Sequence, residues 1–354
     1  MDVFSCNAPY REGGLGWLLA TLVEDARERN DLLSYFATVK KPNDPAGYEV
    51  DLSSYRWMFR SLPLSRRHGW RDFLAAELFD RMVARKLQSA DRFIGFTGRA
   101  HHTFKRARDL RYEQLILESA TSHVANVRRK HQFAHKRYPI EESWLNNAQY
   151  KKILKEYAAA DLIYVSSKYA WQTFIEAGIP ENKLRRRVVN IASRFSPARM
   201  RVSSDAFRIV YVGRLQVSKG IPVLIDAFKL LDNSKAELVL VGGTATVEMD
   251  RYLRRQMARD PRIKITFGDP LSHYHKADVL VHPTFEDALA LAPLEALACG
   301  VPVLVTEDTG MKEYVVNSKN GYVLPTANVD ALVDRLKEMS SYPLKDKFDP
   351  LCII

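Results

Sequence analysis

Short apolar runs alternate with amphipathic stretches along the second half of the chain. The runs that predict strands span residues 207–212, 236–241, 264–267, 277–281 and 301–305. Between them, apolar residues recur at helical spacing, most clearly in 221–231 and 294–299. Continuous apolar strands that alternate with amphipathic helices predict a parallel sheet covered on both faces. We therefore expect a doubly wound α/β domain in this half.

The first half of the chain has a similar but noisier pattern. The runs that predict strands span residues 2–5, 92–97, 114–118 and 161–165, and helical spacing is found in 17–27 and 150–160. Residues 39–65 contain aromatic residues and Pro without a clean period and receive no assignment. No internal repeat is found. The pattern predicts a second α/β domain.

A Ser- and Arg-rich segment, residues 190–205, separates the two patterns and is read as a linker. This division predicts an N-terminal domain over 1–195, a C-terminal domain over 206–340 and a short tail over 341–354. Two such domains are expected to form a cleft near the carboxyl ends of their strands, where ligands bind in open parallel sheets.

The composition excludes several classes of protein. With 46% hydrophobic and 27% charged residues among 354, the chain is neither disordered nor fibrous. Cys6, Cys299 and Cys352 are too widely spaced for a disulfide framework or a metal cluster, which indicates a reducing compartment. No run approaches the roughly 18 apolar residues of a membrane span, and neither a signal peptide nor a prenylation box is recognised. We expect a cytoplasmic protein, with peripheral contact at the cytoplasmic membrane face left open.

The formal net charge is +11, from 53 Lys and Arg against 42 Asp and Glu. Much of the surplus lies in three clusters between residues 100 and 201: Lys105, Arg106, Arg108 and Arg111; Arg128, Arg129, Lys130, Lys136 and Arg137; Lys183, Arg185, Arg186 and Arg187, with Arg194, Arg199 and Arg201 following. Such clusters fit nucleic acid, anionic lipid or a phosphorylated small molecule. An internally paired, solvated surface is the alternative.

The first strand of the C-terminal domain is followed by Gly213-Arg214-Leu215 and then by Ser218-Lys219-Gly220. Glycine at the strand end permits a sharp turn, and two cations near a helix N-terminus suit a pyrophosphate. Arg214 offers a planar fork and Lys219 a movable point charge. An ordinary surface loop is the alternative reading.

A second motif lies in residues 282–303, where Asp287 and Glu295 are separated by seven residues and followed by a small-residue helix and Gly-Val-Pro-Val. With the first motif, it resembles the nucleotide-sugar site of glycosyltransferase family 4. The resemblance covers residues 1–340, being specific in 207–305 and diffuse before 190. It implies the GT-B fold: two Rossmann-like, doubly wound parallel-sheet domains facing a central cleft.

The resemblance also implies roles for individual residues. Glu295 is expected to accept hydrogen bonds from the ribose, Asp287 to contact the transferred sugar, and Arg214 and Lys219 to stabilise the departing nucleotide diphosphate. Because Pro293 suits a helix start, Glu295 is expected in the first helical turn. An acid that merely complements the helix dipole is the alternative for Glu295.

Further positions match the family less specifically. The backbone that closes on the donor is expected at Ala288, Leu289, Ala290 and Leu291, contacts to the base at Phe267 and Gly268, and the first glycine-rich loop at Gly13, Gly14 and Gly16. His123 corresponds to a histidine that contacts the donor sugar, and an imidazole suits this because it can donate or accept. A tight turn at the glycines and a structural role for His123 are the alternatives. Glu118 is a weaker candidate for orienting the acceptor.

The sequence departs from the family at three points. The family usually has Glu at position 287 and Gly-Phe-Gly at 288–290, whereas this chain has Asp287 and Ala288-Leu289-Ala290. Alanine disfavours a positive φ and adds a methyl group near the ligand. The family's C-terminal helix that crosses back to the first domain is not recognised after residue 340. We expect either an unusual donor or impaired turnover.

Taken together, the motifs and the resemblance that they carry imply a retaining hexosyltransferase that moves a sugar from a UDP- or GDP-type nucleotide sugar to a hydroxyl of a glycan, lipid-linked or small-molecule acceptor. No cofactor and no metal are expected, because no metal-ligand spacing is present. The alternatives are a sugar-nucleotide epimerase or a catalytically impaired donor-binding homologue, and a basic nucleic-acid-binding protein. Nucleic acid is disfavoured because the cation clusters lack interleaved aromatic residues.

Overall fold

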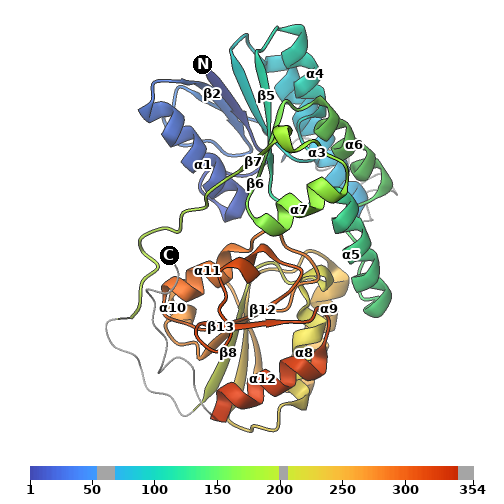
Figure 1. The fold of residues 1–354 in the computed structure, drawn as a ribbon, viewed down its shortest axis with the longest axis vertical. Helices are drawn as coiled ribbons and strands as arrows, with labels where there is room; N and C mark the ends of the chain where they lie inside the picture. The colour runs from blue at the N-terminus through green and yellow to red at the C-terminus, as the bar shows by residue number, and fades with distance from the viewer. Residues whose placement is uncertain (54–67, 199–205, 342–354) are drawn as a thin grey trace. The chain divides into compact units, whose positions relative to one another are not determined.

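The computed structural model describes residues 1–53, 68–198 and 206–341 (Figure 1). The tail predicted beyond Ser341, including Cys352, and the cations Arg199 and Arg201 lie outside these ranges. The chain divides into two compact units. Unit 1 contains Met1–Arg128, Glu142–Ser166 and Trp171–Arg187, and unit 2 contains Arg129–Glu141, Ser167–Ala170 and Val188–Ile354.

Unit 1 is built on a seven-stranded parallel sheet of order β3-β2-β1-β4-β5-β6-β7. The strands are β1 Asp2–Ser5, β2 Leu32–Ala37, β3 Gly47–Glu49, β4 Arg92–Phe96, β5 Gln114–Ser119, β6 Leu162–Val165 and β7 Leu184–Arg186. The helices are α1 Gly13–Glu28, α3 His68–Lys86, α4 His101–Asp109, α5 Val124–Arg137, α6 Asn147–Ala159 and α7 Lys168–Glu176, the last residues of α5 and the first of α7 belonging to unit 2.

Unit 2 contains a six-stranded parallel sheet of order β10-β9-β8-β11-β12-β13. The strands are β8 Phe207–Val212, β9 Ala236–Val241, β10 Ile263–Thr266, β11 Val279–His282, β12 Val303–Thr306 and β13 Gly321–Leu324. The helices are α8 Ile221–Leu230, α9 Val247–Arg259, α10 Leu271–Tyr274, α11 Leu291–Ala298 and α12 Val329–Ser341, with short 3₁₀ turns η3 Val217–Lys219 and η4 Gly310–Glu313.

The strand pattern of unit 2 follows from burial on both faces of its sheet. Along β8, Ile209 and Tyr211 pack with α8 and α12, whereas Val210 packs on the opposite face with α11. Because successive side chains of a strand alternate between faces, a strand covered on both sides must be apolar throughout. Every predicted strand is present to within one or two residues.

The strand order places a switch point in the sheet of unit 2. The chain runs from β8 outward to β9 and β10, and then returns to continue on the other side of β8 with β11. Loops that leave neighbouring strands in opposite directions open a crevice at their carboxyl ends, which is where such sheets bind ligands. The loops after β8 and β11 carry the two sequence motifs.

Candidate functional site

The loops after β8 and β11 are joined by direct backbone contacts. The Phe285 N–H donates to the Ser218 carbonyl oxygen at 2.9 Å, and the Thr284 hydroxyl donates to the same oxygen at 3.2 Å. Gly220 has φ 74°, and a Cβ added there would lie 1.9 Å from the Pro283 carbonyl oxygen. This close approach requires glycine and brings the two motifs together.

Lys219 and Asp287 form an ion pair at this junction. Lys219 Nζ lies 2.5 Å from Asp287 Oδ2, and His282 Nε2 lies 3.2 Å from the same oxygen. Burial acts to raise the pKa of Asp287, but the Lys219 charge and the His282 hydrogen bond outweigh it and hold that pKa below its usual range. The pKa of His282 is lowered by burial. The arrangement is an ionised carboxylate held by one ammonium and one neutral imidazole.

Arg214 lies on the exposed side of the same loop. Among the described residues, its guanidinium makes no hydrogen bond or ion pair, so it is available to an anion. Its carbonyl oxygen accepts a hydrogen bond of 3.0 Å from the hydroxyl of the buried Tyr211. The site therefore combines one paired cation, Lys219, with one open cation.

Glu141 supports the loop from a distant part of the chain that belongs to the same unit. Its carboxylate accepts hydrogen bonds from the Val217 N–H, at 2.7 Å, and from the Thr246 hydroxyl. Burial raises the pKa of Glu141. Glu141, Tyr211 and His282 were not among the site residues predicted from the sequence; only His282 carried a signal, because it lies within the second motif.

The loop over residues 287–290 is fixed mainly through its backbone. Asp287 N–H donates to the Asp308 carbonyl at 3.1 Å, Gly310 N–H donates to the Asp287 carbonyl at 3.1 Å, and the Ser167 hydroxyl donates to the Ala288 carbonyl. Ala288 and Leu289 are buried, and Leu291 is the first residue of α11. Ala290 has φ 68° and ψ 107°. Ala290 thus holds a left-handed backbone that favours glycine.

The expected position of Glu295 in its helix is wrong. Helix α11 begins at Leu291, two residues before Pro293, and no acidic residue lies in its first turn. Proline is tolerated at the third helical position because the first four N–H groups of a helix lack partners within it. Glu295 therefore lies in the second turn, where it accepts a hydrogen bond of 2.7 Å from the Tyr274 hydroxyl. Burial raises the pKa of Glu295.

Phe267 and Gly268 lie at the end of β10. The Phe267 side chain is 71% exposed, and its ring lies 3.6 Å from the position that a Cβ on Gly243 would take. Gly268 has φ 113° and nothing within 4 Å of the position that a Cβ would take. Nearby, Arg194 pairs with Asp269 at 2.8 Å. An exposed aromatic ring beside a glycine offers a flat apolar surface for a planar ligand.

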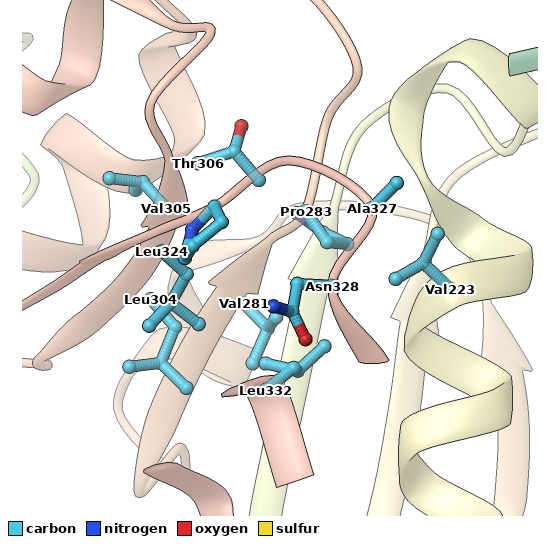
Figure 2. Close-up of a pocket in the computed structure, with 11 residues that line it drawn as sticks. Val223, Val281, Pro283, Leu304, Val305, Thr306, Leu324, Ala327, Asn328 and Leu332 are labelled. Atoms are coloured by element: carbon cyan, nitrogen blue, oxygen red, sulfur yellow. The ribbon is translucent and has the colours of Figure 1, made fainter. Parts of the chain in front are cut away.

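A small pocket lies on the α8 side of the same sheet, next to the loop after β11, which contributes Pro283 to its lining (Figure 2). Its lining comes from α8, from the carboxyl ends of β11, β12 and β13, and from the start of α12: Val223, Val281, Pro283, Leu304, Val305, Thr306, Leu324, Pro325, Ala327, Asn328 and Leu332. The Thr306 hydroxyl already donates to the Thr284 carbonyl at 2.7 Å. Because the lining carries no charge, this pocket does not suit a diphosphate.

In unit 1, the glycine-rich stretch forms the start of α1. Gly13 has φ 61° and nothing within 4 Å of its Cβ position, and both Gly13 and Gly14 are exposed. A Cβ on Gly16 would lie 2.0 Å from the Pro9 carbonyl oxygen. Gly16 is therefore required by packing within unit 1.

His123 is buried among aromatic side chains of unit 1. Its ring centroid lies 5.0 Å from that of Tyr157 and 5.1 Å from that of Phe174, and its Nδ1 accepts a hydrogen bond of 3.2 Å from the Ala125 N–H. Burial lowers the pKa of His123 to about 4, so the ring is neutral near pH 7. Its proposed contact with a donor sugar stays a prediction.

Glu118 is also buried and forms an ion pair with Arg187. Several other members of the three cation clusters are likewise paired. Lys130 lies 2.5 Å from Asp308, Arg108 pairs with Asp161, and Lys183 donates to the carbonyls of Ala158 and Ala160. Part of the positive charge is therefore compensated within each unit.

One group of possible metal ligands lies in unit 1, where Glu77, Asp80 and His102 place ligand atoms within 4.8 Å of one another. The Lys152 ammonium lies 3.0 Å from Glu77 Oε2 and 2.9 Å from Asp80 Oδ2. This group was not predicted from the sequence, because His102 comes from α4 whereas Glu77 and Asp80 come from α3. Lys152 already supplies the positive charge that these carboxylates need.

Of the helices in the described ranges, none is both long and apolar enough to cross a membrane.

The two parallel-sheet units have the GT-B fold, which confirms the predicted fold class. Sucrose-phosphate synthase from Thermosynechococcus elongatus superposes with a TM-score of 0.74 at 16% identity, covering 98% of this chain and 91% of that one. The Anabaena protein HepE in complex with UDP and glucose gives a TM-score of 0.69 at 14% identity, covering 100% and 97%. At such low identity, the likeness shows the fold alone.

The sequence comparisons identify the class of protein domain that the second half of the chain contains. Residues 194–348, less than half of the chain, match the family described as Glycosyl transferases group 1. The capsular polysaccharide biosynthesis glycosyltransferase CapM of Staphylococcus aureus is 29% identical over 143 residues, 38% of this chain and 37% of that protein. An uncharacterized glycosyltransferase of Methanocaldococcus jannaschii is 34% identical over 145 residues, with the same coverage of 38% and 37%. The match spans little more than a third of these relatives, and it identifies a group 1 glycosyltransferase domain over residues 194–348.

Proposed function

We propose that the chain is a retaining, metal-independent glycosyltransferase that uses a UDP- or GDP-type nucleotide sugar. The observation that carries the proposal is the pairing of Lys219 with Asp287 at the switch point of unit 2, beside the exposed Arg214. In the reaction, the bond between the anomeric carbon and the diphosphate oxygen breaks while the acceptor oxygen bonds to that carbon on the same face. The acceptor proton passes to the departing diphosphate.

Each part of a nucleotide sugar has a matching group in unit 2. Phe267 offers an exposed ring for the base, and the Glu295 carboxylate offers an acceptor for ribose hydroxyls. Arg214, Lys219 and the N–H groups at the start of α11 offer positive charge to the diphosphate, whose negative charge grows in the transition state. Asp287 is the acceptor for a hydroxyl of the transferred sugar. HepE has been solved in complex with UDP-glucose, which supports a UDP-type donor.

We further propose that unit 1 is the part of the chain that binds the acceptor. His123 is proposed to contact the donor sugar, Gly13 and Gly14 to approach the ligand by their backbone, and the acceptor to be a glycan, a lipid-linked sugar or a small molecule. The exposed cations of α4, such as Lys105 and Arg106, fit a peripheral contact with an anionic membrane. Neither a cofactor nor a metal has a part in this mechanism.

A thermal-shift panel tests the donor class. Wild-type protein is heated with UDP, GDP, ADP and their glucose or mannose conjugates, because a ligand that binds only the folded state raises the melting temperature. We expect nucleotides and nucleotide sugars of one base to raise the melting temperature more than the others do. If no nucleotide raises the melting temperature, the proposal is wrong.

Transfer itself is tested with a radiolabelled sugar nucleotide and a cell extract as acceptor source. Arg214→Ala is expected to lower the rate constant more than it raises the Michaelis constant, because its contact with the leaving group strengthens in the transition state. The alternative of a donor-binding homologue without transferase activity is favoured by the backbone of Ala290 at φ 68°. Binding of a nucleotide sugar without transfer would select that alternative, and interconversion of the free nucleotide sugar would select an epimerase.

A further inference from the structure

His282 lies at the end of β11 and is almost fully buried. Its Nε2 lies 3.2 Å from Asp287 Oδ2. Because an ionised carboxylate can only accept hydrogen bonds, Nε2 carries the proton and Nδ1 carries a lone pair. Within the described part of the chain, that buried Nδ1 has no hydrogen-bond partner. The ring thus has a single polar contact, and it is directed at Asp287.

The imidazole ring is itself held in a fixed plane. It stacks on the ring of Tyr211 with an interplanar angle of 3° and a centroid separation of 5.9 Å. Tyr211 is fully buried, and its hydroxyl donates to the Arg214 carbonyl oxygen at 3.0 Å. The stack therefore connects the backbone at Arg214 with the carboxylate of Asp287.

Lys219 alone does not fix the orientation of Asp287. An ammonium on a flexible four-carbon chain attracts a carboxylate without imposing a direction, whereas an immobilised ring N–H does impose one. Both groups contact the same Oδ2 atom. The other carboxylate oxygen, Oδ1, is left to a ligand, since no side chain among the described residues forms a hydrogen bond with it.

We propose that His282 is a positioning residue, which holds Asp287 so that its carboxylate meets a hydroxyl of the donor sugar. This inference rests on the proposed function. It goes beyond that function because it assigns sugar recognition to a buried side chain that does not itself contact the ligand. The stacked Tyr211 then has the role of keeping the imidazole in plane.

Two variants separate the hydrogen bond from the packing. His282→Phe keeps a ring for stacking on Tyr211 but removes the N–H, whereas His282→Gln removes the ring but keeps an N–H near the position of Nε2. Dissociation constants are measured by calorimetry on the full chain for UDP-glucose and UDP, and for GDP-mannose and GDP. The ratio of the two constants within a pair isolates recognition of the sugar.

For the pair that the wild type binds, we expect His282→Phe to weaken the sugar nucleotide about tenfold, as for loss of a hydrogen bond to a charged group. Binding of the bare diphosphate should change less than about twofold, and His282→Gln should restore most of the loss. A merely structural role would weaken both ligands equally and leave the ratio unchanged, and an unchanged ratio would overturn the proposal.

A measurement without ligand separates failure of this inference from failure of the proposed function. Nitrogen-15 NMR of labelled histidine reports which ring nitrogen carries the proton. We expect an Nε2–H tautomer for His282, and a changed signal in Asp287→Asn. If the Nδ1–H tautomer is found, the positioning role is wrong even when a nucleotide sugar binds. If the tautomer is as expected but neither sugar nucleotide binds the wild type, the proposed function fails, and the role in sugar recognition fails with it.

Discussion

Lys219 and Asp287, which are 68 residues apart in the sequence, place Nζ and Oδ2 within 2.5 Å of each other at the switch point of the second sheet. Their side chains are 23% and 17% exposed. A partly buried ion pair is costly to break on one side only, because the remaining charge loses its partner but not its burial. The pair thus links the stability of the loops to their proposed chemistry.

We therefore predict that Lys219→Met destabilises the protein by about 2–4 kcal/mol, because it leaves the Asp287 carboxylate buried and unpaired. The double variant Lys219→Met with Asp287→Asn should recover at least half of that loss, since it removes the orphaned charge. Urea denaturation at pH 7 measures both. Additive effects of the two substitutions would show that the pair is not energetically coupled.

We predict that Gly220→Ala, at the junction of the two loops, strongly lowers the free energy of unfolding. Gly220 has φ 74°, and its new methyl group would lie 1.9 Å from the Pro283 carbonyl oxygen. Gly178→Ala is the matched control, because Gly178 has φ 82° but open space around its Cβ position. We expect the control to cost about 1 kcal/mol from backbone strain alone, and Gly220→Ala to cost at least about 2 kcal/mol more. Equal melting temperatures for the two variants would refute the proposed steric conflict.

A substitution of Ala290 is predicted to stabilise the protein, in contrast to Gly220→Ala. It holds φ 68° and ψ 107° directly before α11, a conformation that favours glycine. Ala290→Gly should therefore stabilise the protein by about 1 kcal/mol. The same substitution at Ala296, a buried position inside α11, should destabilise it by about 1 kcal/mol or more. Thermal unfolding of the two variants tests the contrast, and destabilisation by Ala290→Gly would argue against a strained backbone.

Much of the fold was predictable because strands buried on both faces leave continuous apolar runs in the sequence. The two edge strands of the sheet in unit 1 did not leave such runs. β7 Leu184–Arg186 carries two exposed arginines, as suits an edge strand that must not pair further, and β3 Gly47–Glu49 lies in a stretch without a clean period. Both were missed, as were β2 and β13.

The candidate site was predictable only where its residues are close in sequence or belong to a motif. The interval between Asp287 and Glu295 indicated the second loop, but the start of α11 was misplaced because Pro293 also fits inside the first turn. The contact of Glu141 with the Val217 N–H depends on packing between segments 76 residues apart. Tertiary packing of this kind leaves no local pattern in the sequence.

His123 predicts a dependence of stability on pH. The unfolded state has a histidine pKa of about 6.5, and burial lowers that of His123 to about 4 in the folded state. The unfolded chain therefore binds more protons between these values, so the stabilisation is complete above pH 6.5 and is lost as the pH falls towards 4. From pH 7 to 4.5, the unfolding free energy of the wild type should fall by about 2–3 kcal/mol more than that of His123→Phe. His123→Gln, which does not titrate either, should give the same slope, and a slope equal to that of wild type would contradict the assignment.

Phe267 tests the proposed base contact independently of the charges. Its side chain is 71% exposed, so Phe267→Ala should change the unfolding free energy by less than about 0.5 kcal/mol. If a base stacks on the ring, the same substitution should weaken the nucleotide diphosphate that the wild type binds by about tenfold, since stacking on an aromatic ring contributes about 1–3 kcal/mol. Val247→Ala is the control, because Val247 is also an exposed apolar residue of unit 2, at 67%. Calorimetry should show unchanged binding for the control, and unchanged binding for Phe267→Ala would mean that the base lies elsewhere.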